Sequence, residues 1–339
     1  MEFFTVLSVN HCTFNSIKEV RLKEEQKLPE EQQEGKGVSR RGFLKALTGT
    51  AAGIGLSQMI NPALVSAMKK ALEKHPVLWI QGQGCTGCSV SLLNSVEPSI
   101  GKVLLDIISL EYHPTVMASE GETALTHLYR IANEYKGKFS LVVEGAIPLA
   151  ANGKYCILGE LHHKEITMVD ITKELGQMAG SVLAVGTCAA YGGIPAAKGN
   201  LTQATGVQDF FKKFAIKTPV VNVPGCPPHP DWIVGTIAHL ITKGVPELDE
   251  NGRPLMFFGE NIHENCPYLD YFDQEIFSKT FTEKKGCRME IGCKGPDTNA
   301  DCFRRRWNSG LNWCVENAVC IGCVEPGFPD SSSPFYESA

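Results

Sequence analysis

The sequence has no large excess of charge of either sign. Its 339 residues carry 32 basic and 37 acidic side chains, a formal net charge of -5, and this balance argues against nucleic acid as a partner. Charged residues make up only 20% of the chain and apolar residues 43%, so neither a disordered chain nor a coiled coil fits the composition. The length predicts about two domains and a sizeable buried core.

No stretch of the chain is suited to span a membrane as a helix. The segment from Ala46 to Met68 is free of charge, but it contains Gly49, Gln58, Pro62 and other residues that are unfavourable in a lipid-facing helix. The residues that follow Cys323 are few, and Pro, Asp and Ser are prominent among them. We therefore expect no transmembrane helix in this chain, and expect any membrane association to arise through a partner.

The first 67 residues have the features of an export signal. Residues 18–36 are rich in Lys, Glu and Gln, which is typical of a disordered leader. The run Ser39-Arg40-Arg41-Gly42-Phe43-Leu44-Lys45 resembles a twin-arginine signal. It precedes a weakly apolar segment and the small residues Val65-Ser66-Ala67, which suit a cleavage site. We predict that residues 1–67 are a leader, removed on export to the periplasm by the twin-arginine route.

Cysteine, by contrast, is abundant. The chain has 13 cysteines; Cys12 falls in the predicted leader, and many of the others lie near the carboxyl end. Such density in an exported protein indicates either disulfides or metal. The twin-arginine route carries proteins that are already folded, often with a cofactor inserted, so metal is compatible with this destination. A set of disulfides is the alternative.

From Pro76 onward, short apolar strands alternate with helical patterns. This alternation predicts an α/β domain over residues 68–243, built on a doubly wound parallel sheet. The expected strands cover residues 77–81, 103–110, 139–143, 181–185 and 219–223. One expected helix begins near Ser89, and four others cover residues 120–135, 171–178, 207–214 and 231–243.

Four cysteines follow three of these strands. Cys85 and Cys88 follow the first strand, Cys188 the fourth and Cys226 the fifth. Because ligands bind at the carboxyl ends of strands in such sheets, we expect these thiols to converge, and four thiolates match a 4Fe-4S cluster. The loop from Gly82 to Gly87 also fits the G-x-G-x-x-G pattern of dinucleotide sites. We favour the cluster because two thiols in the loop have no role in binding a pyrophosphate.

Residues 244–339 are rich in Gly, Pro, Asn and Cys, which predicts a second, small and irregular domain organised by metal. Its candidate ligands fall into two groups of four: His263, Cys266, Cys287 and Cys293, and then Cys302, Cys314, Cys320 and Cys323. Zinc is an alternative for either group, because Cys-x-x-Cys pairs also make structural zinc sites. Three ligand groups in one chain favour an iron-sulfur relay instead, because zinc cannot change its oxidation state.

Four runs of residues carry a resemblance to a known family. They are Gly82-Gln83-Gly84-Cys85-Thr86-Gly87-Cys88, Val143-Glu144-Gly145-Ala146, Gly186-Thr187-Cys188-Ala189 and Pro224-Gly225-Cys226-Pro227-Pro228-His229-Pro230. From about Val77 to Phe335 the chain resembles the small subunit of nickel-iron hydrogenases. The resemblance implies a flavodoxin-like domain with a proximal 4Fe-4S cluster on Cys85, Cys88, Cys188 and Cys226. It implies a distal 4Fe-4S cluster in the iron-sulfur domain on His263, Cys266, Cys287 and Cys293.

The medial cluster is the place where the chain departs from the common pattern. In this family it is usually 3Fe-4S, with a proline near the vacant corner, and the resemblance assigns its three ligands to Cys302, Cys320 and Cys323. Here Cys314 takes the place of the proline. A fourth thiolate can hold a fourth iron, so we predict a medial 4Fe-4S cluster of lower potential, as in the nickel-iron-selenium branch. A 3Fe-4S cluster follows if Cys314 is an unligated buried thiol.

The resemblance implies the electron-transfer subunit of a heterodimeric uptake hydrogenase. A separate large subunit, with or without selenium, would hold the nickel-iron site and split hydrogen into protons and electrons. This chain would then pass the electrons from the proximal through the medial to the distal cluster, and on to a periplasmic cytochrome c. The alternatives are a regulatory hydrogen sensor, which is expected to lack an export signal, and a disulfide-braced exported binding protein.

Two residues outside the ligand groups complete the predictions. Glu144 ends the third strand, where it either assists proton movement or orders the cysteine loop, and we favour hydrogen bonding at the sheet edge. Cys156 is expected to be a buried structural thiol. The twelve candidate ligands are all assigned to clusters, so no residue that splits hydrogen is expected in this chain.

Overall fold

The computed structural model describes residues 75–334. The predicted leader, with its paired arginines Arg40 and Arg41, lies outside the described residues. Among the residues that are described, no helix is long and apolar enough to cross a bilayer.

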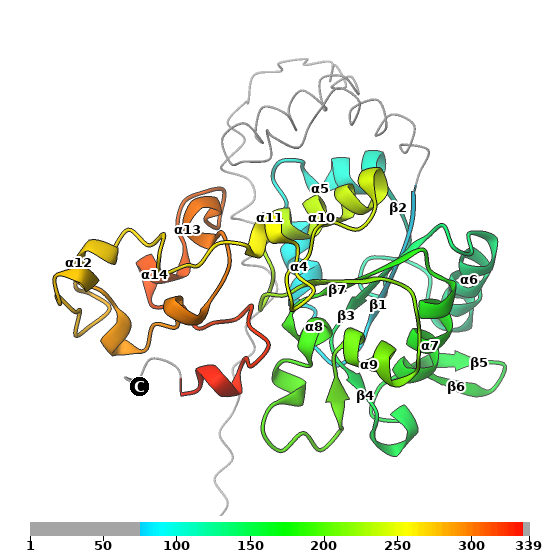
Figure 1. The fold of residues 1–339 in the computed structure, drawn as a ribbon. Helices are drawn as coiled ribbons and strands as arrows, with labels where there is room; N and C mark the ends of the chain where they lie inside the picture. The colour runs from blue at the N-terminus through cyan, green and yellow to red at the C-terminus, as the bar shows by residue number, and fades with distance from the viewer. Residues whose placement is uncertain (1–74, 335–339) are drawn as a thin grey trace, which may run out of the picture. The chain divides into compact units, whose positions relative to one another are not determined.

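A five-stranded parallel sheet forms the centre of the fold (Figure 1). Its strands lie side by side in the order β2-β1-β3-β7-β9. Counted along the chain, this is the order 2-1-3-4-5 that defines flavodoxin-like sheets. The strands are β1 (His75–Gln81), β2 (Ile108–Tyr112), β3 (Ser140–Glu144), β7 (Ser181–Val185) and β9 (Val220–Val223). The predicted doubly wound parallel sheet is therefore confirmed.

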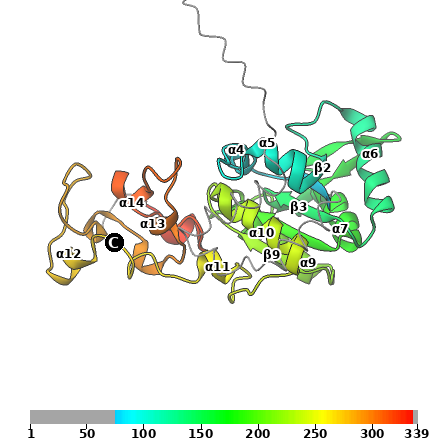
Figure 2. The same cartoon turned by 90° about the horizontal axis from the view of Figure 1, so that it is seen from above.

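Helices cover both faces of the sheet, because successive residues of each buried strand point to opposite sides. Val77 and Trp79 of β1 pack into one core with α4 (Gly87–Leu93) and α10 (Pro230–Lys243). Leu78 and Ile80 pack into the other core. That second core is completed by α6 (Gly121–Glu134), α7 (Met168–Met178) and α9 (Val207–Lys213). Figures 1 and 2 show the two helical layers on either side of the sheet.

The prediction of a strand over residues 103–110 was wrong in its first half. Residues Ile100–Lys102 form α5 and Val103–Ile107 a π-helical turn, so β2 begins only at Ile108. Val103 and Ile107 are buried whereas Leu105 is exposed, a pattern that a helical turn satisfies and an extended strand does not. A run of apolar residues this short does not by itself separate the two conformations.

Two small antiparallel pairs were not predicted. The first joins β5 (Ile157–Leu161) to β6 (Lys164–Thr167), and the second joins β4 (Ile147–Pro148) to β8 (Ala204–Thr205). The turn between β5 and β6 consists of His162 and His163, both with positive φ. It lacks the Asn-Gly or Asp-Gly sequence by which such turns are recognised.

Beyond α10 the described chain carries only short helical segments. They are α11 (Leu255–Phe258), α12 (Leu269–Asp273), α13 (Cys302–Arg305), α14 (Cys314–Asn317) and single 3-10 turns at Met289–Ile291, Gly295–Asp297 and Asp330–Ser332. Buried ion pairs hold this part of the chain together. Arg253 contacts Asp249 at 2.7 Å and Glu325 at 2.9 Å. Because many of the predicted ligands lie in these loops, their positions depend on such contacts rather than on regular structure.

Candidate iron-sulfur cluster sites

Four thiols meet at the carboxyl edge of the sheet. Cys85 and Cys88 lie in the loop and first turn after β1, Cys188 lies in α8 (Thr187–Tyr191) after β7, and Cys226 follows β9. Burial, together with the negative charges of Cys226 and Cys85, raises the pKa of Cys188 to about 11. Burial also raises the pKa of Cys88, together with the charges of Glu144 and of the other three thiols. Each thiol is therefore close enough to the others to be repelled when ionised.

Three glycines lie close to this group of thiols. A Cβ atom at Gly87 would lie 3.1 Å from the Cys85 sulfur, and one at Gly193 would lie 3.0 Å from the Cys188 sulfur. A Cβ at Gly186, whose φ is +89°, would collide with the Cys88 sulfur. The glycines thus bring the backbone close to the thiols, as a cluster that accepts backbone N–H donors requires.

Glu144 is buried beneath the first cysteine loop and accepts five hydrogen bonds. Its Oε1 atom accepts from the backbone N–H groups of Cys88 at 3.0 Å and Ser89 at 3.1 Å. Its Oε2 atom accepts from Trp79 Nε1 and Gln81 Nε2, both at 3.0 Å, and from the Ser89 hydroxyl. The carboxylate therefore ties the first turn of α4 to the ends of β1 and β3.

The group formed by His263, Cys266, Cys287 and Cys293 lies in the loops around α12. The backbone N–H of Cys266 donates to the carbonyl of His263 at 3.1 Å. A Cβ at Gly295 would lie 3.5 Å from the Cys293 sulfur and 3.9 Å from the His263 Cα, so these two residues flank one glycine. Burial raises the pKa of Cys266, and the charge of Cys287 adds to this effect. Burial raises the pKa of Cys293 to about 11, with a smaller contribution from Cys266.

The group formed by Cys302, Cys314, Cys320 and Cys323 is the most buried of the three. The Cys314 thiol hydrogen-bonds to Cys320, which raises the pKa of Cys314 and lowers that of Cys320. Burial and the charges of Cys323 and Cys320 raise the pKa of Cys302, which also accepts a hydrogen bond from the Trp307 side chain. Cys314 therefore lies within this group of thiols and not at its margin.

The three groups follow one another in space. Burial and the charge of Cys320 raise the pKa of Cys323 to about 12, although the backbone N–H of Cys226, from the first group, opposes this rise by hydrogen bonding. On the other side of the central group, the charge of Cys320 raises the pKa of both Cys293 and Cys266. The group at Cys302 thus lies between the group at the sheet edge and the group around α12.

Twelve cysteines lie within residues 75–334, and all are free thiols. Among the same residues, no three His, Cys, Asp or Glu side chains are arranged to hold a single metal ion. Cys156 is half-buried against the core that contains α6 and α7, apart from all three groups.

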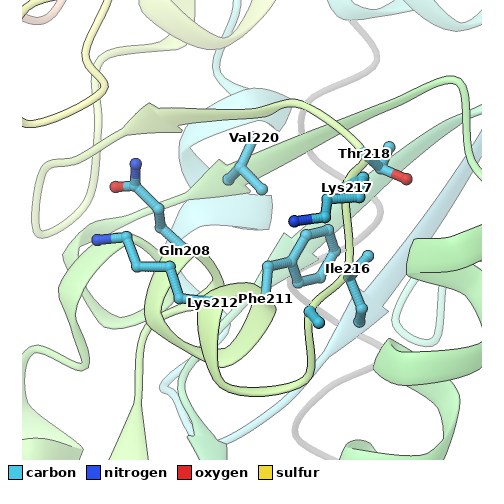
Figure 3. Close-up of a pocket in the computed structure, with 8 residues that line it drawn as sticks. Gln208, Phe211, Lys212, Ile216, Lys217, Thr218 and Val220 are labelled. Carbon is cyan, nitrogen blue, oxygen red and sulfur yellow. The ribbon is translucent and has the colours of Figure 1, made fainter.

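A cavity of about 300 Å³ opens between α9 and the start of β9 (Figure 3). Its lining includes Phe211, Lys212, Lys217 and Val220. None of the candidate ligands lines it, because it opens at the amino end of β9 whereas the thiols gather at the carboxyl ends of the strands.

Two family models match the chain. The family described as "NADH ubiquinone oxidoreductase, 20 Kd subunit" matches residues 85–240, which include the four thiols of the sheet edge. The family that describes the C-terminal part of the NiFe/NiFeSe hydrogenase small subunit matches residues 258–336, which include the other two groups.

Individual relatives match over nearly their full length. The periplasmic NiFeSe hydrogenase small subunit of Desulfomicrobium baculatum is 59% identical over 311 residues, which cover 88% of this chain and 98% of the relative. The periplasmic NiFe hydrogenase small subunit of Solidesulfovibrio fructosivorans is 40% identical over 306 residues, which cover 89% of this chain and 93% of the relative.

Solved structures give the same result. A chain of the recombinant NiFeSe hydrogenase from Desulfovibrio vulgaris Hildenborough matches with a TM-score of 0.77 at 62% identity, covering 78% of this chain and 98% of that chain. A chain of the reduced, active NiFeSe hydrogenase from Desulfomicrobium baculatum matches with a TM-score of 0.77 at 61% identity, covering 79% of this chain and all of that chain. The chain therefore belongs to the family of NiFe/NiFeSe hydrogenase small subunits.

Proposed function

We propose that this chain carries electrons through three iron-sulfur clusters, from the nickel-iron site of a partner large subunit to an external acceptor. The observation that carries the proposal is the contact of the three ligand groups in series. The Thr187 hydroxyl, which accepts from the N–H of Gly225 beside Cys226, donates to the Cys323 carbonyl. The N–H of Lys294, which follows Cys293, donates to the Cys320 carbonyl at 2.8 Å. A chain of redox centres in this order has the sheet edge at one end and the loop of His263 at the other.

The proximal cluster would be held by Cys85, Cys88, Cys188 and Cys226, and the distal cluster by His263, Cys266, Cys287 and Cys293. The chemistry of these residues fits such groups. Thiolates gathered at one site repel one another, and burial together with the neighbouring thiols raises the pKa of Cys88 and Cys188. Bound iron would relieve the repulsion, because its positive charge would lie among the thiolates. Each cluster, when bound, supplies one-electron oxidation and reduction.

The medial cluster would be 4Fe-4S, held by Cys302, Cys314, Cys320 and Cys323. Cys314 supports this proposal because its thiol hydrogen-bonds to Cys320. The indole N–H of the preceding residue, Trp313, gives further support. Trp313 is 1% exposed, and its Nε1 atom has no acceptor among the described residues. Buried N–H groups are rarely left without an acceptor, and the sulfur atoms of a cluster would provide one.

Glu144 would order the loop that carries Cys85 and Cys88. Its two oxygens are occupied by five donors from β1 and the start of α4. Of the two roles considered for this residue, the contacts favour ordering of the loop over proton movement. A fixed loop keeps the proximal ligands in place while electrons enter and leave.

The large subunit would cover the carboxyl edge of the sheet. Cys85 and Cys226, two of the four proximal ligands, are exposed in this chain alone. On the neighbouring helix α4, Val90 and Leu93 are also exposed. Exposed apolar side chains beside a redox site are typical of a surface that a partner protein covers. The relatives are subunits of NiFe and NiFeSe hydrogenases, so the partner would carry a nickel-iron site, with selenium in the NiFeSe branch.

The external acceptor would be a periplasmic cytochrome c that receives electrons at His263. This residue is half-buried, and its ring packs edge-on against Phe272 with the ring centroids 4.6 Å apart. The names of the relatives place them in the periplasm. We propose the same location for this chain, reached through residues 1–67 as a twin-arginine leader. The mature chain would then comprise a flavodoxin-like domain (68–243) and an iron-sulfur domain (244–339).

Iron and acid-labile sulfide, measured in the complex purified anaerobically with its large subunit, test this proposal. We expect about twelve irons with matching sulfide in this subunit, as three 4Fe-4S clusters require. The variant Cys156→Ser provides the matched control and should leave the iron content unchanged. An iron content near zero in the wild-type chain would contradict the relay.

A further inference from the structure

Arg288 is a buried cation beside the proposed distal ligands. It follows Cys287 in the chain and is only 4% exposed. Its Nη1 atom donates to the carbonyl of Ala318 at 2.6 Å, and its guanidinium carbon lies 5.7 Å from the ring centroid of Tyr268. Its Nε atom is buried and has no hydrogen-bond partner among the described residues. The hydrogen-bonding capacity of the guanidinium is thus incompletely used.

The charge of Arg288 also lacks a counter-charge. Within residues 75–334, no carboxylate lies within 4.0 Å of its guanidinium. Two other buried arginines in this part of the chain are each held by two carboxylates. Arg253 contacts Asp249 and Glu325, and Arg305 contacts Asp231 at 2.9 Å and Asp301 at 2.6 Å. A buried charge is costly unless it is paired, so the environment of Arg288 lacks an anion.

Backbone and ring contacts place Arg288 beside the proposed distal ligands. Arg288 follows Cys287 in the chain, and its carbonyl accepts a hydrogen bond from the backbone N–H of Cys293 at 3.2 Å. Its guanidinium lies over the ring of Tyr268, whose backbone N–H donates to the Cys266 sulfur at 3.5 Å. The charge of Arg288 therefore lies beside residues that would bind the distal iron.

We propose that the Arg288 guanidinium is the counter-charge of the distal cluster and raises the reduction potential of this last centre of the relay. The inference rests on the proposed function. One electron passes from the medial to the distal centre and then to the acceptor, and Arg288 is neither oxidised nor reduced. Reduction adds one negative charge to the centre, and a nearby cation stabilises the reduced form more than the oxidised form. Arg288 thus acts on the cluster through its nearby positive charge, and it does not bind the iron.

The test is a redox titration of the anaerobically purified complex, followed by electron paramagnetic resonance of each cluster. Two variants, Arg288→Met and Arg288→Gln, remove the charge, and the glutamine keeps a hydrogen-bond donor for Ala318. At the wild-type midpoint potential of the distal cluster, we expect the ratio of reduced to oxidised cluster to fall about tenfold in both, which is 59 mV for a one-electron couple. Arg288→Lys keeps the charge and should stay near the wild-type ratio.

The control is Arg130→Met, which removes an exposed arginine that pairs with Glu134 on α6. It changes the net charge equally and should leave the distal potential unchanged. An unchanged potential in both neutral variants would overturn the inference while the iron content still supported the proposed function. If the neutral variants lose distal iron and the lysine variant retains it, the distal cluster needs a positive charge at position 288. This result would support the role of Arg288 as the counter-charge. Loss of iron from all three Arg288 variants would assign the residue a purely structural role and overturn it.

Discussion

The hydroxyl group of Thr187 donates a hydrogen bond to the backbone carbonyl of Cys323. The same hydroxyl accepts a hydrogen bond from the backbone N–H of Gly225 at 2.9 Å. Thr187 precedes Cys188, and Gly225 precedes Cys226, so one buried side chain connects two loops of the proposed proximal site to a ligand of the proposed medial site. The proposed electron path crosses between the sheet edge and the loops beyond α10 at this point.

Thr187→Val should weaken the connection without removing a ligand. The valine leaves the Cys323 carbonyl and the Gly225 N–H without this partner, which costs about 1–3 kcal/mol for a buried group. We expect slower reduction of an added acceptor by hydrogen. Exchange of hydrogen with solvent deuterons needs only the nickel-iron site and should be unchanged. Thr187→Ser keeps the hydroxyl and should behave as wild type. If the added acceptor were reduced at the same rate by the valine and serine variants, Thr187 would have no connecting role.

Glu144→Gln tests the ordering of the first cysteine loop. A glutamine amide presents an NH₂ group to donors that the carboxylate now accepts from, so we expect the free energy of unfolding to fall by about 2 kcal/mol. Turnover should slow while the iron content stays at the wild-type value. Both quantities are measured on the same anaerobic preparation. If Glu144→Gln kept the turnover and the stability of the wild type, the five hydrogen bonds to Glu144 would be dispensable.

Much of this arrangement follows from the sequence because sheet topology is regular. The apolar strands placed Cys85, Cys88, Cys188 and Cys226 after strand ends, and the parallel sheet brings those ends to one edge. The prediction needed no side-chain detail, since every strand in a parallel sheet ends on the same side. It failed at residues 103–107, where a short apolar run formed a π-helical turn.

The contacts between the ligand groups did not follow from the sequence. Cys226 and Cys323 meet through loops that have no periodic pattern, and their separation along the chain gives no indication of contact. Arg288 was also missed, because a lone arginine after a cysteine looks like any surface residue. Its burial and its lack of a carboxylate partner are visible only when the surrounding loops are in place.

Arg253→Met should destabilise the loops that carry the second and third ligand groups. Arg253 is 2% exposed, and it pairs with Asp249 and Glu325, of which Glu325 also accepts from the Asn299 N–H. Removing one partner of a buried pair leaves uncompensated charge and costs about 3–5 kcal/mol. Arg130→Met breaks an exposed pair with Glu134 and should cost about 1 kcal/mol or less. Thermal unfolding of the two complexes compares these effects directly, and equal shifts would contradict the expectation.

Acidification should destabilise the protein through His229. Burial lowers the pKa of His229 below its usual value of 6.5. In the folded protein the neutral ring accepts from the Asp231 N–H at 3.1 Å and donates to the Arg306 carbonyl at 2.8 Å. The unfolded chain therefore binds more protons in the window below pH 6.5, so stability is lost as pH falls, by up to about 1.4 kcal/mol per pH unit for this group. Denaturation midpoints at pH 7.5 and 5.5 should differ less in His229→Gln than in wild type.

Cys314→Pro removes the proposed fourth ligand of the medial cluster and should remove one iron from the medial site. Because a 3Fe-4S cluster needs only three thiolates, Cys302, Cys320 and Cys323 should still hold it, and the iron content should fall from about twelve to about eleven. The medial centre should then take up an electron at a higher potential, because one thiolate charge is lost. Electron paramagnetic resonance of the oxidised complex distinguishes the two cluster types. A wild-type spectrum and iron content in the variant would show that Cys314 is an unligated thiol, despite its hydrogen bond to Cys320.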